Sequence, residues 1–161
     1  MMDKKEFLAL LYIKTSGDFG ELQTIGVSVN YNLKTVRKED IKEDLIRIAT
    51  LAGSSLKKTS VVASQEPFPH GFVDLFFENE ILVRYSFTAT KAVAYKDWRL
   101  YLTNAEAYLR ENKDTLEILA AKPESKPTLY SVQELAEGMT EKAISEANEA
   151  EITNIVEELL G

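Results

Sequence analysis

The only histidine of the chain, His70, lies between Pro69 and Gly71. Imidazole titrates near neutral pH, so histidine is the side chain most often used as a general acid or base. A base needs a nucleophile or a metal to act on, and the chain has no cysteine and no G-x-S-x-G elbow. We therefore interpret the Pro-His-Gly corner as the start of a β-hairpin, with catalysis by His70 as the less favoured alternative.

Carboxylates are the second group of residues that could do chemistry. Asp40, Glu43 and Asp44 lie on adjacent turns of one predicted helix and could bind a divalent ion. Basic residues at ion-pair spacing accompany them, which is typical of a solvated helix face rather than a metal site. A further acidic residue, Asp74, lies in the predicted hairpin, where it could pair with Arg84 across the strands.

Two short segments resemble phosphate-handling motifs. The segment 53–60, GSSLKKTS, follows a helix and lacks the second glycine of a phosphate-binding loop. Asp18-Phe19-Gly20 matches a kinase triplet, but no glycine-rich loop or H-R-D triplet accompanies it. Neither segment predicts nucleotide chemistry, and we interpret Asp18-Phe19-Gly20 as part of a turn between a helix and a strand.

The N-terminal half alternates between helical and strand periodicity. Asp3 and Glu6 form a capping-box pattern that predicts a helix over 4–14. Apolar residues alternate with small or polar ones from 24 to 33, which predicts a half-solvated strand. The three-and-four spacing of apolar residues over 41–52, with Gly53 after it, predicts a second helix.

The middle of the chain predicts three strands and then a helix. A short strand at 59–64 precedes the hairpin, whose strands over 73–77 and 81–87 are joined by Glu78-Asn79-Glu80. We expect the segment 96–113 to be a helix that packs across the sheet, with a second short helix over 114–121. The expected helix is based on the spacing of six residues, which are Trp98, Tyr101, Leu102, Ala105, Tyr108 and Leu109.

These elements predict an α+β fold. We expect a mostly antiparallel sheet of about four strands, packed by two or three helices, with a C-terminal helical extension. The Pro-rich stretch KPESKP predicts a break in the chain. We therefore predict an α+β domain at 1–121, a linker at 122–130 and an acidic helical tail at 131–161.

The net charge of −7 lies entirely in that tail, which holds eight glutamates and one lysine. Its apolar positions have helical spacing, and such a face must dock on the parent domain, a second copy or another protein. We weigh docking on the parent domain equally against docking on a second copy or on another protein taken together. The residues predicted to bind a partner are Ile144, Ile152, Ile155, Val156 and Leu159.

The sequence favours a non-enzymatic, intracellular protein-interaction module, such as an adaptor, inhibitor or assembly factor, that acts through surface contacts and this tail. The alternative is a divalent-metal-dependent hydrolase or nuclease that uses clustered carboxylates, and a pocket lined by Tyr and Phe residues is a third hypothesis. We predict no catalytic residue, no cofactor and no metal ligand. The expected partner is another protein or a second copy of the chain, without nucleic acid or membrane. The absence of cysteine and of a signal-like N-terminus favours a cytoplasmic location.

Overall fold

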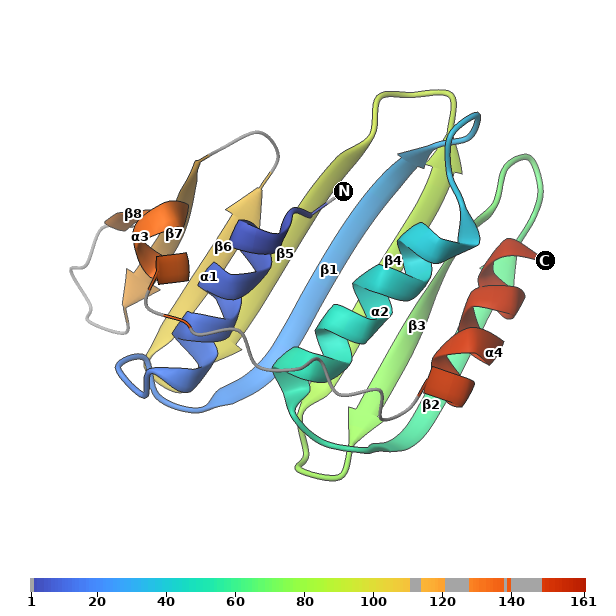
Figure 1. The fold of residues 1–161 in the computed structure, drawn as a ribbon. Coiled ribbons are helices and arrows are strands. Elements are labelled where there is room, and N and C mark those ends of the chain that lie inside the picture. Colours follow the sequence, from blue (N-terminus) through green and yellow to red (C-terminus); the bar gives the residue numbers. More distant parts are fainter. Residues whose placement is uncertain (1, 111–113, 121–127, 138, 140–148) are drawn as a thin grey trace.

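One eight-stranded sheet forms the centre of the protein in the computed structural model, which describes residues 2–110, 114–120, 128–137, 139 and 149–161. The strand order is β2-β3-β4-β1-β5-β6-β7-β8 (Figure 1). The strands are β1 (Leu22–Asn32), β2 (Leu56–Ser64), β3 (His70–Phe77), β4 (Leu82–Thr90), β5 (Tyr95–Leu102), β6 (Ala105–Arg110), β7 (Thr115–Ala120) and β8 (Thr128–Ser131).

The helices of the described residues all cover the same face of this sheet (Figure 1). They are α1 (Lys4–Thr15), α2 (Lys38–Ala52), α3 (Val132–Glu137) and α4 (Glu149–Leu160). The other face carries no helix in this part of the chain.

Strand pairing corrects the predicted four-stranded sheet. β1 pairs in parallel with β4 and antiparallel with β5, and the other described pairings are antiparallel, so the sheet is mixed. The parallel pair arises because the hairpin β3–β4 folds back beside β1 after the α2 crossover. The prediction of about four, mostly antiparallel strands is therefore wrong in strand number, and it missed the parallel pair at the centre.

The predicted helix over 96–113 is also wrong. Its described residues, 96–110, lie in the β5–β6 hairpin, with Asp97 opposite Arg110 and Trp98 opposite Leu109. Lys96, Trp98, Leu100 and Leu102 alternate with more exposed residues, which is the period of a strand. The turn at 103–104 shifts the phase of that alternation, and the shifted pattern imitates helical spacing. The short helix expected over 114–121 is likewise a strand, β7.

Several local predictions are confirmed. Asp3 caps α1, and Glu6 completes the capping box with hydrogen bonds of 2.8 and 3.1 Å. Gly53 ends α2 in the left-handed conformation, at φ 64°, where glycine avoids the steric cost of a Cβ. The strand near 24–33, the strand near 59–64 and the hairpin strands correspond to β1, β2, β3 and β4.

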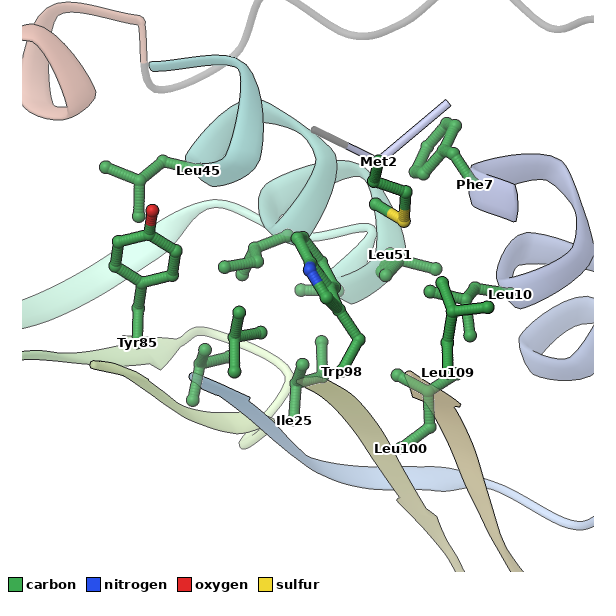
Figure 2. Packing of buried hydrophobic residues seen from close by; sticks show 14 of the residues in the cluster. Met2, Phe7, Leu10, Ile25, Leu45, Leu51, Tyr85, Trp98, Leu100 and Leu109 are labelled. Carbon is green, nitrogen blue, oxygen red and sulfur yellow. The ribbon is translucent and has the colours of Figure 1, made fainter. Parts of the chain in front are cut away.

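The core lies between the sheet and its helices. Figure 2 shows apolar side chains from both layers meeting there, among them Leu10, Ile25, Leu51, Trp98 and Leu100. Trp98 and Leu100 have no exposed surface. Burial of this apolar set is the main term that favours the folded sheet–helix pair.

The residues predicted as the acidic tail contact the rest of the chain wherever they are described. α3 packs on α1, and α4 packs on α2, β2 and β3. Two ion pairs tie α4 to α2, Lys38–Glu157 at 2.8 Å and Lys42–Glu149 at 2.9 Å. Residues 121–127 and 140–148 lie outside the described part, so the predicted division into domain, linker and tail stays a prediction.

No helix in the described part of the chain combines the length and the apolar character that crossing a membrane requires.

Candidate functional site

The open face of the sheet is built from the alternate residues of the same strands that form the core. On β1, Val27 and Val29 are buried under the helices, so Ser28 between them faces the open side. The same alternation of side chains along β4 and β5 places Ser86 and Tyr95 on that side. The register puts Ser28 directly beside Ser86.

A shallow depression of about 200 Å³ lies on this open face. Strands β3, β4, β1 and β5 contribute to it, so segments far apart in the sequence meet there. Its lining residues are Ser28, Val29, His70, Gly71, Phe72, Ser86, Phe87, Thr88 and Tyr95. We refer to this depression as the open-face pocket.

The hydroxyls of Ser28 and Ser86 lie side by side in the open-face pocket. Neither Ser28 nor Ser86 makes a side-chain hydrogen bond to any residue in the part of the chain that the structure describes. A serine hydroxyl offers one donor and two acceptor positions. The pair therefore presents unused hydrogen-bonding capacity at adjacent positions of two parallel strands.

The next row of the pocket is held in place by Asn30, which is buried. Its side-chain oxygen accepts hydrogen bonds from Thr88 at 2.7 Å and Thr90 at 3.1 Å. Its amide nitrogen donates to the carbonyl of Val93 at 3.1 Å, in the loop between β4 and β5. Asn30 thus fixes the loop that leads to Tyr95, whose ring is 44% exposed beside the pocket.

An aromatic wall closes the pocket on the β3 side. The guanidinium of Arg84 lies 4.4 Å from the ring centre of Phe72, which is cation–π geometry. Arg84 also donates two hydrogen bonds to Asp74, at 2.7 and 2.8 Å, and so holds the pKa of Asp74 below its usual value. The predicted pairing of Asp74 with Arg84 is confirmed, and it fixes the guanidinium over the wall.

His70 is the first residue of β3 and lines the pocket, as an exposed side chain. Its Nδ1 lies 2.8 Å from the carbonyl oxygen of Phe68. The interpretation of His70 as the start of a hairpin is confirmed, since it begins the β3 strand of the β3–β4 hairpin. The structure adds that this corner is also part of a polar pocket.

The carboxylates weighed as a metal site point in different directions. Asp44 is only 2% exposed and accepts hydrogen bonds from Tyr31 at 2.5 Å and Tyr85 at 2.7 Å. Asp40 pairs with Arg37, and Glu43 pairs with Arg47. No group of three histidine or acidic side chains that could hold a metal occurs among the described residues.

The buried Asp44 cluster has strongly perturbed titration. Burial is the largest cause of the raised pKa of Asp44, and the hydrogen bonds from the two tyrosines oppose it. Burial and the neighbouring Asp44 charge raise the pKa of Tyr31 and Tyr85 well above the usual tyrosine value. The cluster joins α2 to β1 and β4, and its three side chains satisfy one another under the helices.

The tail residues predicted to bind a partner lie in the core where they are described. Ile152, Ile155, Val156 and Leu159 of α4 are buried against the protein's own sheet and α2. Ile144 lies outside the described residues. Partner binding by these residues stays a prediction, and α4 would have to leave its present position to expose them.

Comparisons with known proteins found similarity in fold but not in sequence. No family model matches the chain, and no curated protein sequence matches it. Solved structures do match. A Thermotoga maritima protein described as an oxidoreductase is 11% identical with a TM-score of 0.68, over 94% of this chain and 56% of that chain. The chain therefore shares its fold with about half of that protein.

Two further matches are dehydrogenases or their relatives. UDP-N-acetylglucosamine 3-dehydrogenase from Acidithiobacillus ferrooxidans is 14% identical with a TM-score of 0.63, over 96% of this chain and 50% of that chain. An inositol dehydrogenase homologue from Azotobacter vinelandii, solved with NADH and myo-inositol, is 6% identical with a TM-score of 0.60, over 79% of this chain and 40% of that chain. The chain spans about half the length of these proteins.

These matches correct the predicted function. The expectation of a non-enzymatic interaction module, with a metal-dependent hydrolase as the alternative, is contradicted because the fold is one that oxidoreductases use. Sequence reasoning also missed the pocket residues Ser28, Ser86 and Tyr95. The only local signal for the first was the small, polar set of alternate residues in β1.

Proposed function

We propose that this chain forms the ligand-binding part of an oxidoreductase-type protein and holds a small polyhydroxylated molecule in the open-face pocket. The observation that carries the proposal is the convergence of unused hydrogen-bonding groups on Ser28, Ser86 and His70 beside the ring of Phe72. Hydroxyl groups of a ligand can both donate to and accept from such side chains.

The size and composition of the pocket suit one ring rather than an extended ligand. Its volume of about 200 Å³ is below the roughly 300–1,000 Å³ of sites for drug-sized molecules. The aromatic wall at Phe72 offers an apolar surface for the C–H face of a ring, while the serines face its hydroxyls.

The charges around the pocket favour a neutral ligand. Arg84 is paired with Asp74, and Arg99 of β5 is paired with Asp97 through two hydrogen bonds of 3.1 Å. Each guanidinium therefore already has a carboxylate partner, and an anionic ligand would have to displace it. Among the similar structures, one was solved with myo-inositol, which is a neutral polyhydroxylated ring, and another is named for UDP-N-acetylglucosamine, whose sugar is neutral but whose diphosphate is charged.

A dinucleotide cofactor does not fit this chain. The glycine-rich fingerprint G-x-G-x-x-G is absent from the sequence. In the β1–α2 connection, where a parallel strand leads into a helix, the chain has Asn-Leu-Lys-Thr-Val-Arg, whose side chains prevent the close backbone approach that a pyrophosphate needs. We propose that this chain does not itself bind a dinucleotide.

Isothermal titration calorimetry with two neutral polyhydroxylated rings, myo-inositol and N-acetylglucosamine, tests the proposal. We expect binding by the unchanged chain and a loss of about tenfold in affinity in the double variant S28A/S86A, since each serine contributes about one hydrogen bond. NADH is the comparison ligand, and we expect no heat from it.

The matched control is S60A, because Ser60 is an exposed residue of β2 that pairs with Asp74 outside the pocket lining. It should bind as the unchanged chain does. The proposal is wrong if neither polyhydroxylated ligand binds, or if S60A weakens binding as much as the double variant does. Our expectation of a cytoplasmic location, based on the absence of cysteine, belongs to the same proposal.

A further inference from the structure

The hydrogen bond of His70 determines which of its ring nitrogens carries the proton in the neutral form. Nδ1 lies 2.8 Å from the carbonyl oxygen of Phe68. A carbonyl oxygen can only accept, so Nδ1 must be the donor. A neutral imidazole has one donor and one acceptor, and its Nε2 is therefore left as an acceptor.

This acceptor differs from the other polar groups of the pocket. Ser28, Ser86 and Tyr95 carry hydroxyls, which donate and accept. Thr88 already donates to Asn30. A ligand hydroxyl that accepts a hydrogen bond from a serine can still donate its own proton in a second hydrogen bond. While the ring of His70 is neutral, its Nε2 can only accept such a hydrogen bond.

Uncharged residues flank His70 on both neighbouring strands. On the adjacent strands it faces Ser64 of β2 and Thr88 of β4, which are uncharged. The surrounding strands and loops carry the charged residues Glu66 and Lys91, the Asp74–Arg84 pair and the Asp97–Arg99 pair. Lys91 lies over the ring of Phe68, 5.9 Å from its centre.

We propose that His70 is the specificity-determining acceptor of the open-face pocket and makes ligand binding depend on pH. This inference rests on the proposed function of the pocket. Neutral His70 accepts the proton of a ligand hydroxyl through Nε2. Protonation turns Nε2 into a donor, so the ligand hydroxyl loses its acceptor. The ligand then also removes water from the charged imidazolium, which costs free energy because the ligand is neutral.

Calorimetry with myo-inositol at about pH 8 and about pH 5 tests the inference, since histidine changes charge between these values. We expect the affinity to fall about fivefold at the lower pH, which corresponds to about one hydrogen bond. His70→Gln keeps an acceptor that does not titrate, so it should bind nearly as well as the unchanged chain at about pH 8 and lose the pH dependence. His70→Ala should bind about fivefold more weakly at both pH values.

Nitrogen NMR of the imidazole gives a second measurement that needs no ligand. We expect the neutral ring to carry its proton on Nδ1. A proton on Nε2, or a pH dependence that persists in His70→Gln, would overturn the role of His70 while leaving the pocket intact. Absence of binding at every pH would overturn the proposed function itself, and with it this inference.

Discussion

The two faces of the sheet are made by alternate residues of the same strands, and they differ in how their hydroxyl groups are partnered. Under the helices, Asp44 satisfies the hydroxyls of Tyr31 and Tyr85, and Glu6 pairs with Lys96 at 2.9 Å. On the open face, Ser28 and Ser86 keep hydroxyls without a partner in the described part of the chain. A buried polar group generally needs a partner, and the exception among the described residues is Nε1 of Trp98, whereas an accessible group can bind water or a ligand.

The largest expected difference between the faces is in stability, measured on neighbouring residues of β5. Leu100 has no exposed surface, and Leu100→Ala should lower the free energy of unfolding by about 2–5 kcal/mol because it leaves a cavity. Tyr101 faces the open side, and Tyr101→Ala should cost about 1 kcal/mol or less. Urea denaturation monitored by circular dichroism measures both, and equal losses would contradict the assignment of the two faces.

The buried cluster should be nearly as sensitive. Asp44→Ala removes the shared acceptor and leaves two tyrosine hydroxyls buried without a partner, at a cost of about 2–4 kcal/mol. Asp44→Asn keeps an oxygen acceptor and should cost clearly less. Urea denaturation of both variants measures the two losses. An asparagine variant as unstable as the alanine variant would show that the negative charge of Asp44, rather than its oxygen acceptor, is needed.

Alkaline pH should act on the helix-covered face. Tyr31 and Tyr85 have a pKa in the folded protein above the unfolded value of about 10, so their contribution is complete below that pH and is lost as the pH rises. Each should lower the free energy of unfolding by about 1.4 kcal/mol per pH unit above about pH 10.

The double variant Y31F/Y85F should remove that part of the slope, which urea denaturation at several alkaline pH values measures. The comparison variant is Tyr108→Phe on the open face, which should reduce the slope only up to about pH 12, because a hydrogen bond to Glu106 raises the pKa of Tyr108 to about 12. An unchanged slope in Y31F/Y85F would mean that the two hydroxyls are ionised in the folded protein.

The smallest expected effect on stability is at the Asp74–Arg84 pair of the open face. Exposed ion pairs contribute little, so Asp74→Asn should change the free energy of unfolding by less than about 1 kcal/mol. The same substitution should weaken binding of myo-inositol, because Arg84 would no longer be fixed over Phe72. Calorimetry and urea denaturation of one variant separate the two roles, and a large loss of stability would contradict this reading.

Local patterns were enough to predict part of this fold. The alternation over 24–33, the capping box at Asp3 and Glu6 and the glycine after α2 each correspond to the observed elements. The segment 96–113 failed because two short strands with a phase shift at the turn imitate the spacing of a helix. Its six guiding residues came from both strands, so periodicity alone could not separate the two structures.

The pocket could not be predicted, because its parts are brought together by pairing between distant strands. Ser28 and Ser86 become neighbours only through the parallel β1–β4 pair, which the crossover by α2 and the later hairpin create. His70 was recognised as the only histidine, but its sequence neighbours are the residues of a turn. The α4 positions were predicted as an apolar face, and the structure places those it describes against α2, β2 and β3.

The measurement that tests the central claim most directly is a nitrogen–proton NMR titration of the labelled chain with myo-inositol. The account predicts that the shifted amide signals cluster on Ser28, His70, Phe72, Ser86 and Tyr95, while those of the α1 and α2 core positions stay unchanged. Shifts concentrated on the helix-covered face, or no shifts at millimolar ligand, would contradict the claim that the open face of this sheet is the ligand-binding face.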